Sequence, residues 1–287
     1  MTAETLVACL TPQGRAAIAV IAVRGPHAWA IVQRLFAPRA SRPLPEQPEV
    51  GATWLGSLGA PGQNVADEVV VVCKRMAPSP WLEVHCHGGP EVVRWLVELI
   101  TSEGATACSW QDLECRTTEN ALQALATIAL ASAPTVRTAS ILLGQQQGSL
   151  GRLVAQVRSE LERGNASKAA ELLHSTVRHG PVGLHLTEPW RVAIVGAPNV
   201  GKSSLVNAVA GYQRAIVAPT PGTTRDVVST RLAIDGWPVE LLDTAGLRAD
   251  AGALEEQGIA LARAARAAAD LCLWVVDAST EPVKSAP

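Results

Sequence analysis

The feature that most constrains this chain is an apolar strand that leads directly into a glycine-framed loop and then into a helix. Arg191–Val195 has the composition of a buried strand, and Gly196–Ser203 follows it with the pattern G-x-x-x-x-G-K-S. The glycines let such a loop wrap a phosphate, so that backbone N–H groups and the helix N-terminus face the anion. A helix from Ser204 to about Ala210 completes this strand–loop–helix context. The sequence therefore predicts a phosphate-binding loop in an α/β domain.

The residue types in this loop predict separate roles in holding a nucleotide and its metal ion. Lys202 would place its ammonium against the β- and γ-phosphates, and the Ser203 hydroxyl would ligate Mg²⁺. The other residues of the loop that we expect to contact the nucleotide are Asn199, Val200, Gly201 and Ser204. This part of the chain is thus expected to bind a nucleoside triphosphate together with Mg²⁺.

A second motif, Pro221–Asp226, follows the predicted helix and reads PGTTRD. It offers Thr224 as a second hydroxyl ligand for Mg²⁺, in a loop that a γ-phosphate could order. An ATPase would not need this loop, so the motif favours GTP or GDP as the nucleotide. The remaining residues of this segment that we expect at the nucleotide are Ala218, Pro219, Thr220, Gly222 and Thr223.

A third motif reads DTAG and comes after two predicted strands, Val227–Ile234 and Val239–Leu242. Asp243 can hold Mg²⁺ through a water molecule, and the backbone amide of Gly246 can contact the γ-phosphate. Thr244 and Ala245 lie between them and are also expected at the nucleotide. Three motifs in this order, each at a strand end, are typical of a GTPase.

Leu247 follows the third motif at the position where many small GTPases carry a glutamine that orients the attacking water. A leucine cannot orient water, so another residue must do so. The nearest candidates are Glu255 and Glu256. Both could instead simply begin the predicted helix Leu254–Ala269, where acidic side chains favour the helix dipole. Residue chemistry alone leaves these two interpretations open.

The first 113 residues alternate strand and helix patterns and predict a compact α+β domain. Helices are expected over His27–Phe36 and from Pro90 to about Glu103, and the Pro-, Gly- and Ser-rich stretch Ala37–Gly62 is expected to be a loop. The expected strands are Thr5–Leu10, Ala16–Val23, Glu68–Lys74, Trp81–His87 and Ala105–Ser109.

Residues 114–189 change to a composition of Ala, Leu, Gln and Arg and predict a short helical domain that ends in a linker, Arg178–Pro189. The expected helices are Ala121–Ala131, Ile141–Leu150 and Leu150–Leu161. Residues 190–287 would form the GTPase domain as far as a strand at Leu271–Asp277. The fold expected for the chain is therefore multidomain, with α+β and α/β parts.

Composition limits the other functions that the chain could have. A net charge of −2 gives no bulk attraction to nucleic acid or to an anionic membrane, so any contact with RNA would be local or made by a partner. The six cysteines include no C-x-x-C pair and are expected to be buried free thiols. The sequence His85-Cys86-His87 lacks a nearby third ligand, so we do not expect a metal there. With no signal peptide or apolar span, the chain is expected to be soluble and cytoplasmic.

Five segments of the chain are similar to the motifs of one known family. Thr11–Val20 is similar to TPxGRGAIAV, and Glu83–Pro90 is similar to ExxxHGGP. Gly196–Asn207 matches GxPNxGKSSLxN, while Ile216–Val227 and Asp243–Arg248 match IVxxxxGTTRDV and DTAGLR. Over almost its whole length the chain resembles the tRNA-modification GTPase family MnmE, also called TrmE. The two N-terminal motifs separate this family from the Era and Der ribosome-assembly GTPases.

The resemblance implies a mechanism in which K⁺ stands where an arginine finger would stabilise charge on the transferring phosphoryl group. The K⁺ ligand of the family matches Asn199, and the other K⁺ contacts fall on Ala218, Thr220 and Thr223, partly through backbone carbonyls. The catalytic glutamate of the family falls on Glu255. Together with Lys202 and Thr224, whose roles follow from the motifs above, Glu255 completes the set of residues expected in catalysis.

The resemblance also implies partners and a second ligand. The family forms homodimers, and it works with the flavin protein MnmG on the wobble uridine of certain tRNAs. Its N-terminal domain binds formyl-tetrahydrofolate with an arginine, a glutamate and a lysine. In this chain the glutamate is retained as Glu83, but Ala22 and Thr118 stand at the two cationic positions, with Arg24 two residues beyond the first. We therefore expect folate to bind poorly or not at all.

The chain departs from the family pattern in other ways. Pro287 comes before the N-K-x-D motif that reads guanine, and Ser109–Leu125 replaces the family's FxxRAFLNGKxDLxQAE. The second half of the helical domain and the cysteine-bearing tail of the family are also absent from the sequence. These departures predict weak nucleotide binding with little guanine preference. Two alternatives to the enzyme stay open: a non-catalytic paralogue that dimerises and senses nucleotide, and a ribosome-assembly GTPase.

Overall fold

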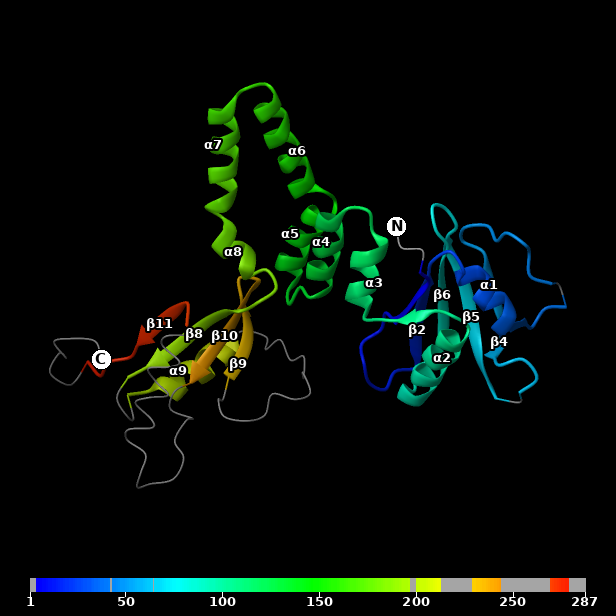
Figure 1. The fold of residues 1–287 in the computed structure, drawn as a ribbon. Coiled ribbons are helices and arrows are strands. Elements are labelled where there is room, and N and C mark those ends of the chain that lie inside the picture. The colour runs from blue at the N-terminus through cyan, green and yellow to red at the C-terminus, as the bar shows by residue number, and fades with distance from the viewer. Residues whose placement is uncertain are drawn as a thin grey trace. The chain divides into compact units, whose positions relative to one another are not determined.

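The computed structural model describes residues 4–41, 43–63, 65–196, 200–212, 229–243 and 269–278 of the 287. The chain divides into two compact units, Met1–Ala124 and Leu125–Pro287, and each is described here by itself (Figure 1). The division into domains at residues 113 and 189 stays a prediction.

The first unit is built on a seven-stranded sheet with the order β3-β4-β5-β6-β2-β1-β7. Neighbouring strands are antiparallel, except that β1 and β7 are parallel. The strands are β1 (Leu6–Cys9), β2 (Ile18–Arg24), β3 (Phe36–Pro38), β4 (Thr53–Gly59), β5 (Ala66–Arg75), β6 (Trp81–His87) and β7 (Thr106–Ala107). The predicted α+β fold of this part of the chain is confirmed.

Helices cover the two faces of this sheet unequally. Side chains of α1 (Ala28–Leu35) and α2 (Pro90–Ser102) share one buried cluster with residues from six of the strands. The helix α3 (Trp110–Thr117) packs on the other face, where Leu113 joins Leu6, Ala8 and Ala22. Because side chains alternate along a strand, Val7 and Val23 point into the first cluster while their neighbours point into the second.

The expectation of a loop over Ala37–Gly62 is wrong, because β3 and β4 lie in this stretch. The glycine content of this stretch suggested a loop, but Gly56 allows β3 to pair closely with β4. A Cβ at Gly56 would lie 2.2 Å from the carbonyl oxygen of Ala37 and 2.6 Å from the Phe36 ring. Only a glycine fits at that point of β4, so the residue that interrupts the strand pattern is the one that makes the pairing possible.

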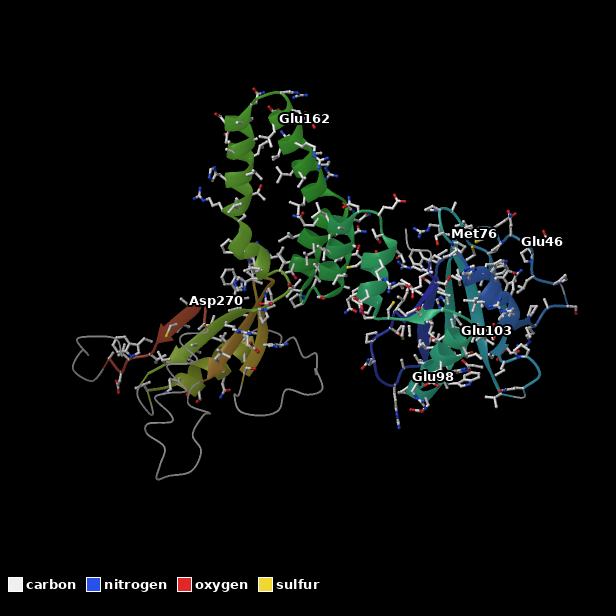
Figure 2. All side chains as sticks on the ribbon, in the orientation of Figure 1. Glu46, Met76, Glu98, Glu103, Glu162 and Asp270 are labelled. Atoms are coloured by element: carbon white, nitrogen blue, oxygen red, sulfur yellow. The ribbon has the colours of Figure 1, made fainter. Side chains whose placement is uncertain are left out.

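A helical segment follows, with α4 (Ala121–Ala131), α5 (Val136–Gln146), α6 (Ser149–Glu162), α7 (Ala166–Val177) and α8 (Gly180–Leu184). Figure 2 shows Glu162 at the tip of the α6–α7 hairpin. The helix α5 begins five residues earlier than expected, because Thr135 and Thr138 form a capping box at its N-terminus. The predicted linker Arg178–Pro189 instead contains α8, a helix of 5 residues.

The rest of the second unit is a four-stranded sheet with the order β11-β8-β10-β9. Its described elements are β8 (Trp190–Val195), α9 (Lys202–Tyr212), β9 (Ser229–Ile234), β10 (Trp237–Asp243) and β11 (Leu271–Trp274). The strand β8 is parallel to β10 and β11, whereas β9 pairs with β10 in antiparallel fashion. Val206 of α9 packs on one face of this sheet, against Ile194, Leu232 and Leu241. The predicted α/β part is thus present.

The six cysteines are all free thiols, but they are not all buried as expected. Cys73 and Cys86 are buried in the first unit, whereas Cys115 and Cys272 are exposed. Cys115 lies two residues beyond the buried Leu113 of α3, on the outer side of that helix, and Cys272 is on an edge strand. No helix in the described ranges is long and apolar enough to cross a membrane.

The cysteines give a direct test of the packing of the first unit. Burial, followed by the negative charge of Asp67 and the neighbouring Cys9, raises the pKa of the Cys86 thiol to about 11. At pH 8 only roughly one Cys86 thiol in a thousand would be the reactive thiolate. We predict that iodoacetamide at pH 8 alkylates Cys115 in the folded protein and leaves Cys86 unmodified until urea is added. Equal labelling of both thiols, read by peptide mass spectrometry, would contradict this packing.

Candidate nucleotide site

The phosphate-binding motif lies where three parallel strands end. In β8, Ile194 lies opposite Asp243 of β10, and Val195 lies opposite Trp274 of β11. The carboxyl ends of these strands therefore meet at one edge of the sheet. Ligands of open α/β sheets bind outside this edge. The chain continues from β8 into Gly196, so the predicted loop begins at this edge.

The glycines of the motif are required by the backbone. Gly196 has a φ of 153°, and a Cβ there would lie 2.3 Å from the carbonyl oxygen of Val275. Gly201 has a φ of 96°, and its carbonyl oxygen accepts the first bond of α9, from the N–H of Leu205 at 2.9 Å. Side chains at either position would strain the backbone or collide with the strand beside it.

Lys202 is the first residue of α9 and points back to the loop. Its ammonium donates a hydrogen bond to the carbonyl oxygen of Gly196 at 2.9 Å, and the residue is 7% exposed. Ser203 follows and is exposed at the start of the helix. Free N–H groups and the positive end of the helix dipole lie at such an N-terminus and favour an anion. Strand end, glycine turn, lysine and helix N-terminus together form the geometry that binds a phosphate.

The structure describes some of the predicted site residues and not others. Asp243 ends β10 beside β8, so its backbone lies at the same edge as Gly196. Val200, Gly201, Lys202, Ser203 and Ser204 are in the loop and the first turn of α9. Outside the described residues lie Asn199, Ala218, Pro219, Thr220, Pro221, Gly222, Thr223, Thr224, Thr244, Ala245, Gly246 and Glu255.

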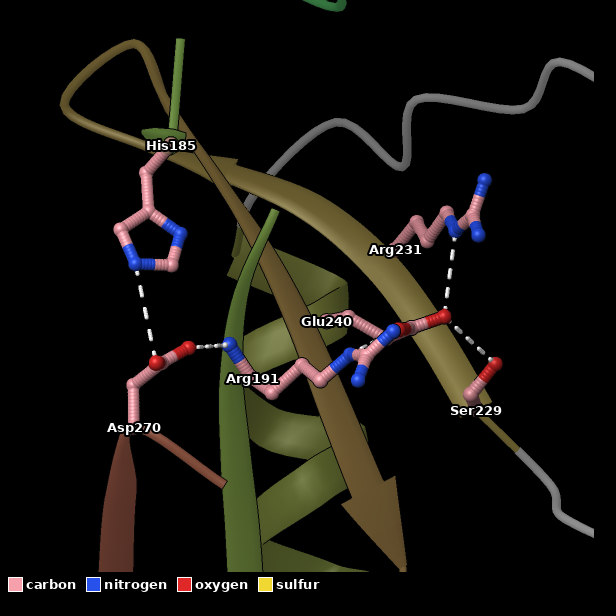
Figure 3. A network of polar contacts seen from close by, with 6 residues as sticks. All are labelled: His185, Arg191, Ser229, Arg231, Glu240 and Asp270. Atoms are coloured by element: carbon pink, nitrogen blue, oxygen red, sulfur yellow. Dashed lines mark hydrogen bonds and ion pairs between the residues drawn. The ribbon is translucent and has the colours of Figure 1, made fainter. Parts of the chain in front are cut away.

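A polar network that the sequence did not reveal holds the sheet together on the face away from α9 (Figure 3). Glu240, on β10, is 9% exposed and accepts hydrogen bonds from Arg231 Nε and Ser229 Oγ, both at 3.1 Å. Arg191 Nε of β8 lies 3.8 Å from the same carboxylate. One carboxylate thus joins three strands. The alternation of Val239, Glu240 and Leu241 signals that Glu240 points away from the apolar core, although it does not identify the partners.

The network continues to the helical segment through Asp270, which precedes β11 (Figure 3). Asp270 accepts a hydrogen bond from the backbone N–H of Arg191 at 2.7 Å, and its other oxygen lies 3.6 Å from His185 Nε2. The His185 ring stacks on Trp190, with ring centroids 3.6 Å apart. These contacts fix the residues that follow α8 against the start of β8.

Glu83, the predicted residue of the first unit, lies in β6 opposite Ala22 of β2. Its side chain is 13% exposed, and Oε2 lies 3.4 Å from His85 Nε2 and 3.7 Å from Lys74 Nζ. The neighbouring His87 is paired with Asp67 instead, at 2.6 Å. Among the described residues, no three His, Cys, Asp or Glu side chains are grouped closely enough to hold a metal ion.

Arg24 is on the same face of this sheet and is held from two sides. Its Nη1 donates to Glu114 Oε2 at 2.9 Å and to Thr117 Oγ1 at 3.0 Å. Its guanidinium carbon lies 3.7 Å from the centre of the Trp81 ring. Thr118 donates to the second oxygen of Glu114 at 3.0 Å. Arg24 is therefore an internal contact between the sheet and α3.

Two family models match the chain in separate regions. The model for the N-terminus of the GTP-binding protein TrmE matches residues 5–117, and the model for 50S ribosome-binding GTPases matches residues 191–286. The match to ribosome-binding GTPases covers only the GTPase part of the chain, residues 191–286. The first match accounts for the N-terminal unit, which a ribosome-assembly GTPase would leave unexplained.

Curated relatives match almost the whole chain. Proteins named tRNA modification GTPase MnmE are similar to it in Symbiobacterium thermophilum, with 31% identity over 97% of the chain and 68% of the relative, and in Moorella thermoacetica, with 32% identity over 98% and 67%. The protein of the same name in Parvibaculum lavamentivorans is 34% identical over 95% of the chain and 69% of its own length. Together with the N-terminal match and the loop geometry, these relatives show that the chain belongs to the MnmE family of tRNA modification GTPases.

Proposed function

We propose that this chain binds GTP with Mg²⁺ and hydrolyses it, with the help of K⁺, in the modification of the wobble uridine of tRNAs. One observation carries the proposal: the Lys202 ammonium is held at Gly196, at the edge where β8, β10 and β11 end. Family membership points to the same chemistry. In this proposal the loop at Gly196–Ser203 binds the phosphates, and the first unit pairs with that of a second copy of the chain.

The residues of this chain would divide the work on the nucleotide. Lys202 and the N–H groups at the start of α9 would hold the β- and γ-phosphates, where negative charge is concentrated. Ser203, Thr224 and Asp243 would hold Mg²⁺, which neutralises charge on the phosphate oxygens. Glu255 would orient the attacking water, since Leu247 has no polar group with which to do so. Lys202 and Ser203 begin α9 next to the strand edge, and the backbone of Asp243 lies at that edge, which supports this assignment.

The K⁺ ion would act as a fixed positive charge beside the transferring phosphoryl group. Asn199 would supply an amide oxygen to the ion, and Ala218, Thr220 and Thr223 would supply further oxygens, partly from backbone carbonyls. Pairing of two GTPase parts in a homodimer would close this site, and a flavin protein of the MnmG type would be the partner on tRNA. A net charge of −2 is consistent with leaving most of the contact with RNA to that partner.

Formyl-tetrahydrofolate does not fit the first unit of this chain well. Ala22 and Thr118 carry no charge at the two positions where the family resemblance places cations, and Ala22 is fully buried. Arg24 is already bound by Glu114. Glu114 also adds a second carboxylate on the sheet face that carries Glu83. An anionic ligand on this face would therefore meet the carboxylates of Glu83 and Glu114, and the guanidinium of Arg24 is already paired with Glu114. We therefore assign no role to folate.

The response to monovalent ions tests the proposed function. We predict that K⁺ accelerates GTP hydrolysis by the protein at least tenfold over Na⁺, which is a small part of the roughly 10³–10⁵ that an arginine finger supplies. Asn199→Ala should remove the difference between the two salts, and Glu255→Ala should slow turnover without abolishing nucleotide binding. Equal rates in K⁺ and Na⁺ would refute the K⁺ assignment. Nucleotide binding with no hydrolysis in either salt would favour a non-catalytic nucleotide sensor.

The folate assignment has its own test. Trp81 lies against Arg24 on the sheet face in question, so a bound pteridine there should quench tryptophan fluorescence. We predict no saturable quenching by formyl-tetrahydrofolate in the micromolar range after correction for absorbance. A free-tryptophan sample carried through the same titration provides that correction. Saturable micromolar quenching would show that the site accepts the ligand in spite of Glu114.

A further inference from the structure

The N-terminus of α5, in the helical segment, holds the tight turn between β9 and β10. Arg137 Nη1 donates to the carbonyl oxygen of Asp235 at 2.7 Å and lies 2.6 Å from its carboxylate. The guanidinium carbon lies 5.1 Å from the centre of the Trp237 ring. Thr135 Oγ1 donates to the carbonyl oxygen of Gly236 at 2.6 Å. Both residues of the turn, and Trp237 that follows it, are therefore in contact with α5 or its N-cap.

The conformation of this turn is fitted to Arg137. Ile234 pairs with Trp237, so the turn has two residues, and both are left-handed: Asp235 has a φ of 48° and Gly236 a φ of 76°. Such turns match the twist of the two strands that they join. A Cβ at Gly236 would lie 2.9 Å from the Cβ of Arg137. The backbone of the turn thus sits directly against the arginine side chain.

The two strands behind the turn lead to the two segments that the proposed function places at Mg²⁺. The strand β9 begins at Ser229, five residues after Thr224, and β10 ends at Asp243 itself. Six consecutive residue pairs join the strands without a bulge. Glu240 adds bonds to Ser229 and across to β8, so the paired strands cannot slide past each other without breaking this network. A shift of the turn is therefore transmitted to both ends.

We propose that Arg137 is a positioning residue for GTP hydrolysis: by holding the β9–β10 turn against α5, it sets where β9 begins and where β10 ends, and with the end of β10 it sets the backbone position of Asp243. The inference rests on the proposed function. Because energetic coupling between two sites is reciprocal, nucleotide binding would in turn bias the placement of α5 and of the helical segment. Arg137 and Asp235 have 44% and 86% of their side-chain surface exposed, so the ion pair contributes little to folding and its removal should leave the fold intact.

The experiment compares GTP turnover and nucleotide affinity of the full chain with those of three variants. Arg137→Ala should lower kcat by roughly three- to tenfold and leave KM for GTP and Kd for GDP within about twofold, because the phosphate loop is untouched. Arg137→Lys keeps the charge for Asp235 but loses the planar contact with Trp237, so it should recover part of the rate. Arg163→Ala is the matched control, since Arg163 forms an exposed ion pair in the same helical segment, with Glu160. It should behave as wild type.

Each result decides the inference. Unchanged kcat in Arg137→Ala would overturn it and leave the proposed function standing. An equal loss in Arg163→Ala would also overturn it, because the effect would then be a general loosening of the helical segment. If the wild-type chain binds GTP but does not turn it over, hydrolysis is refuted, and amide hydrogen exchange of Ser229–Ile234 decides instead. Faster exchange in Arg137→Ala alone would show that Arg137 holds the β9–β10 turn, and equal exchange in all variants would contradict that role.

Discussion

The contact between the Lys202 ammonium and the carbonyl oxygen of Gly196 is the interaction on which the account of this site depends. A lysine that is 7% exposed has given up most of its hydration, and burial of an ammonium is costly unless oxygen atoms surround it. The N-terminus of α9 and the turn at Gly196 provide the place where phosphate oxygens can surround it. The buried charge therefore accounts for the preference of the loop for an anion, whereas the backbone conformation at Gly196 and Gly201 accounts for its glycines.

The two ends of the strands in the sheet of the second unit make different contacts. At the carboxyl ends of the parallel strands lie the phosphate loop and Asp243. At the opposite edge lie Trp190, with His185 stacked on it, and the β9–β10 turn that Arg137 holds. Glu240 lies between these edges and joins three strands through one carboxylate. The helical segment therefore contacts the turn between the two strands, and one of these strands, β10, ends at Asp243.

Motif reasoning predicted the strand that ends at Val195 and the helix that follows, and pattern alone gave the bounds of β6 and α4. It failed where a residue type had two uses. Gly56 was assigned to a loop because glycine weakens strands, whereas here it lets β3 approach β4. The pairing of Arg24 with Glu114, 90 residues apart, has no local signal and depends on α3 packing on the sheet. Tertiary contacts of this kind decide whether a charged side chain is available to a ligand.

Nucleotide binding by Lys202→Met tests the central claim most directly, because methionine keeps the length and bulk of the buried side chain and removes only the charge. Titration with fluorescent GDP in the presence of Mg²⁺ should show saturable binding by the wild-type chain and roughly 10- to 100-fold weaker binding by Lys202→Met, as expected for the loss of a hydrogen bond to a charged group. The exposed Lys168, which is paired with Glu171, provides the control, and Lys168→Met should bind as wild type. Equal affinity of the wild type and Lys202→Met would contradict the account.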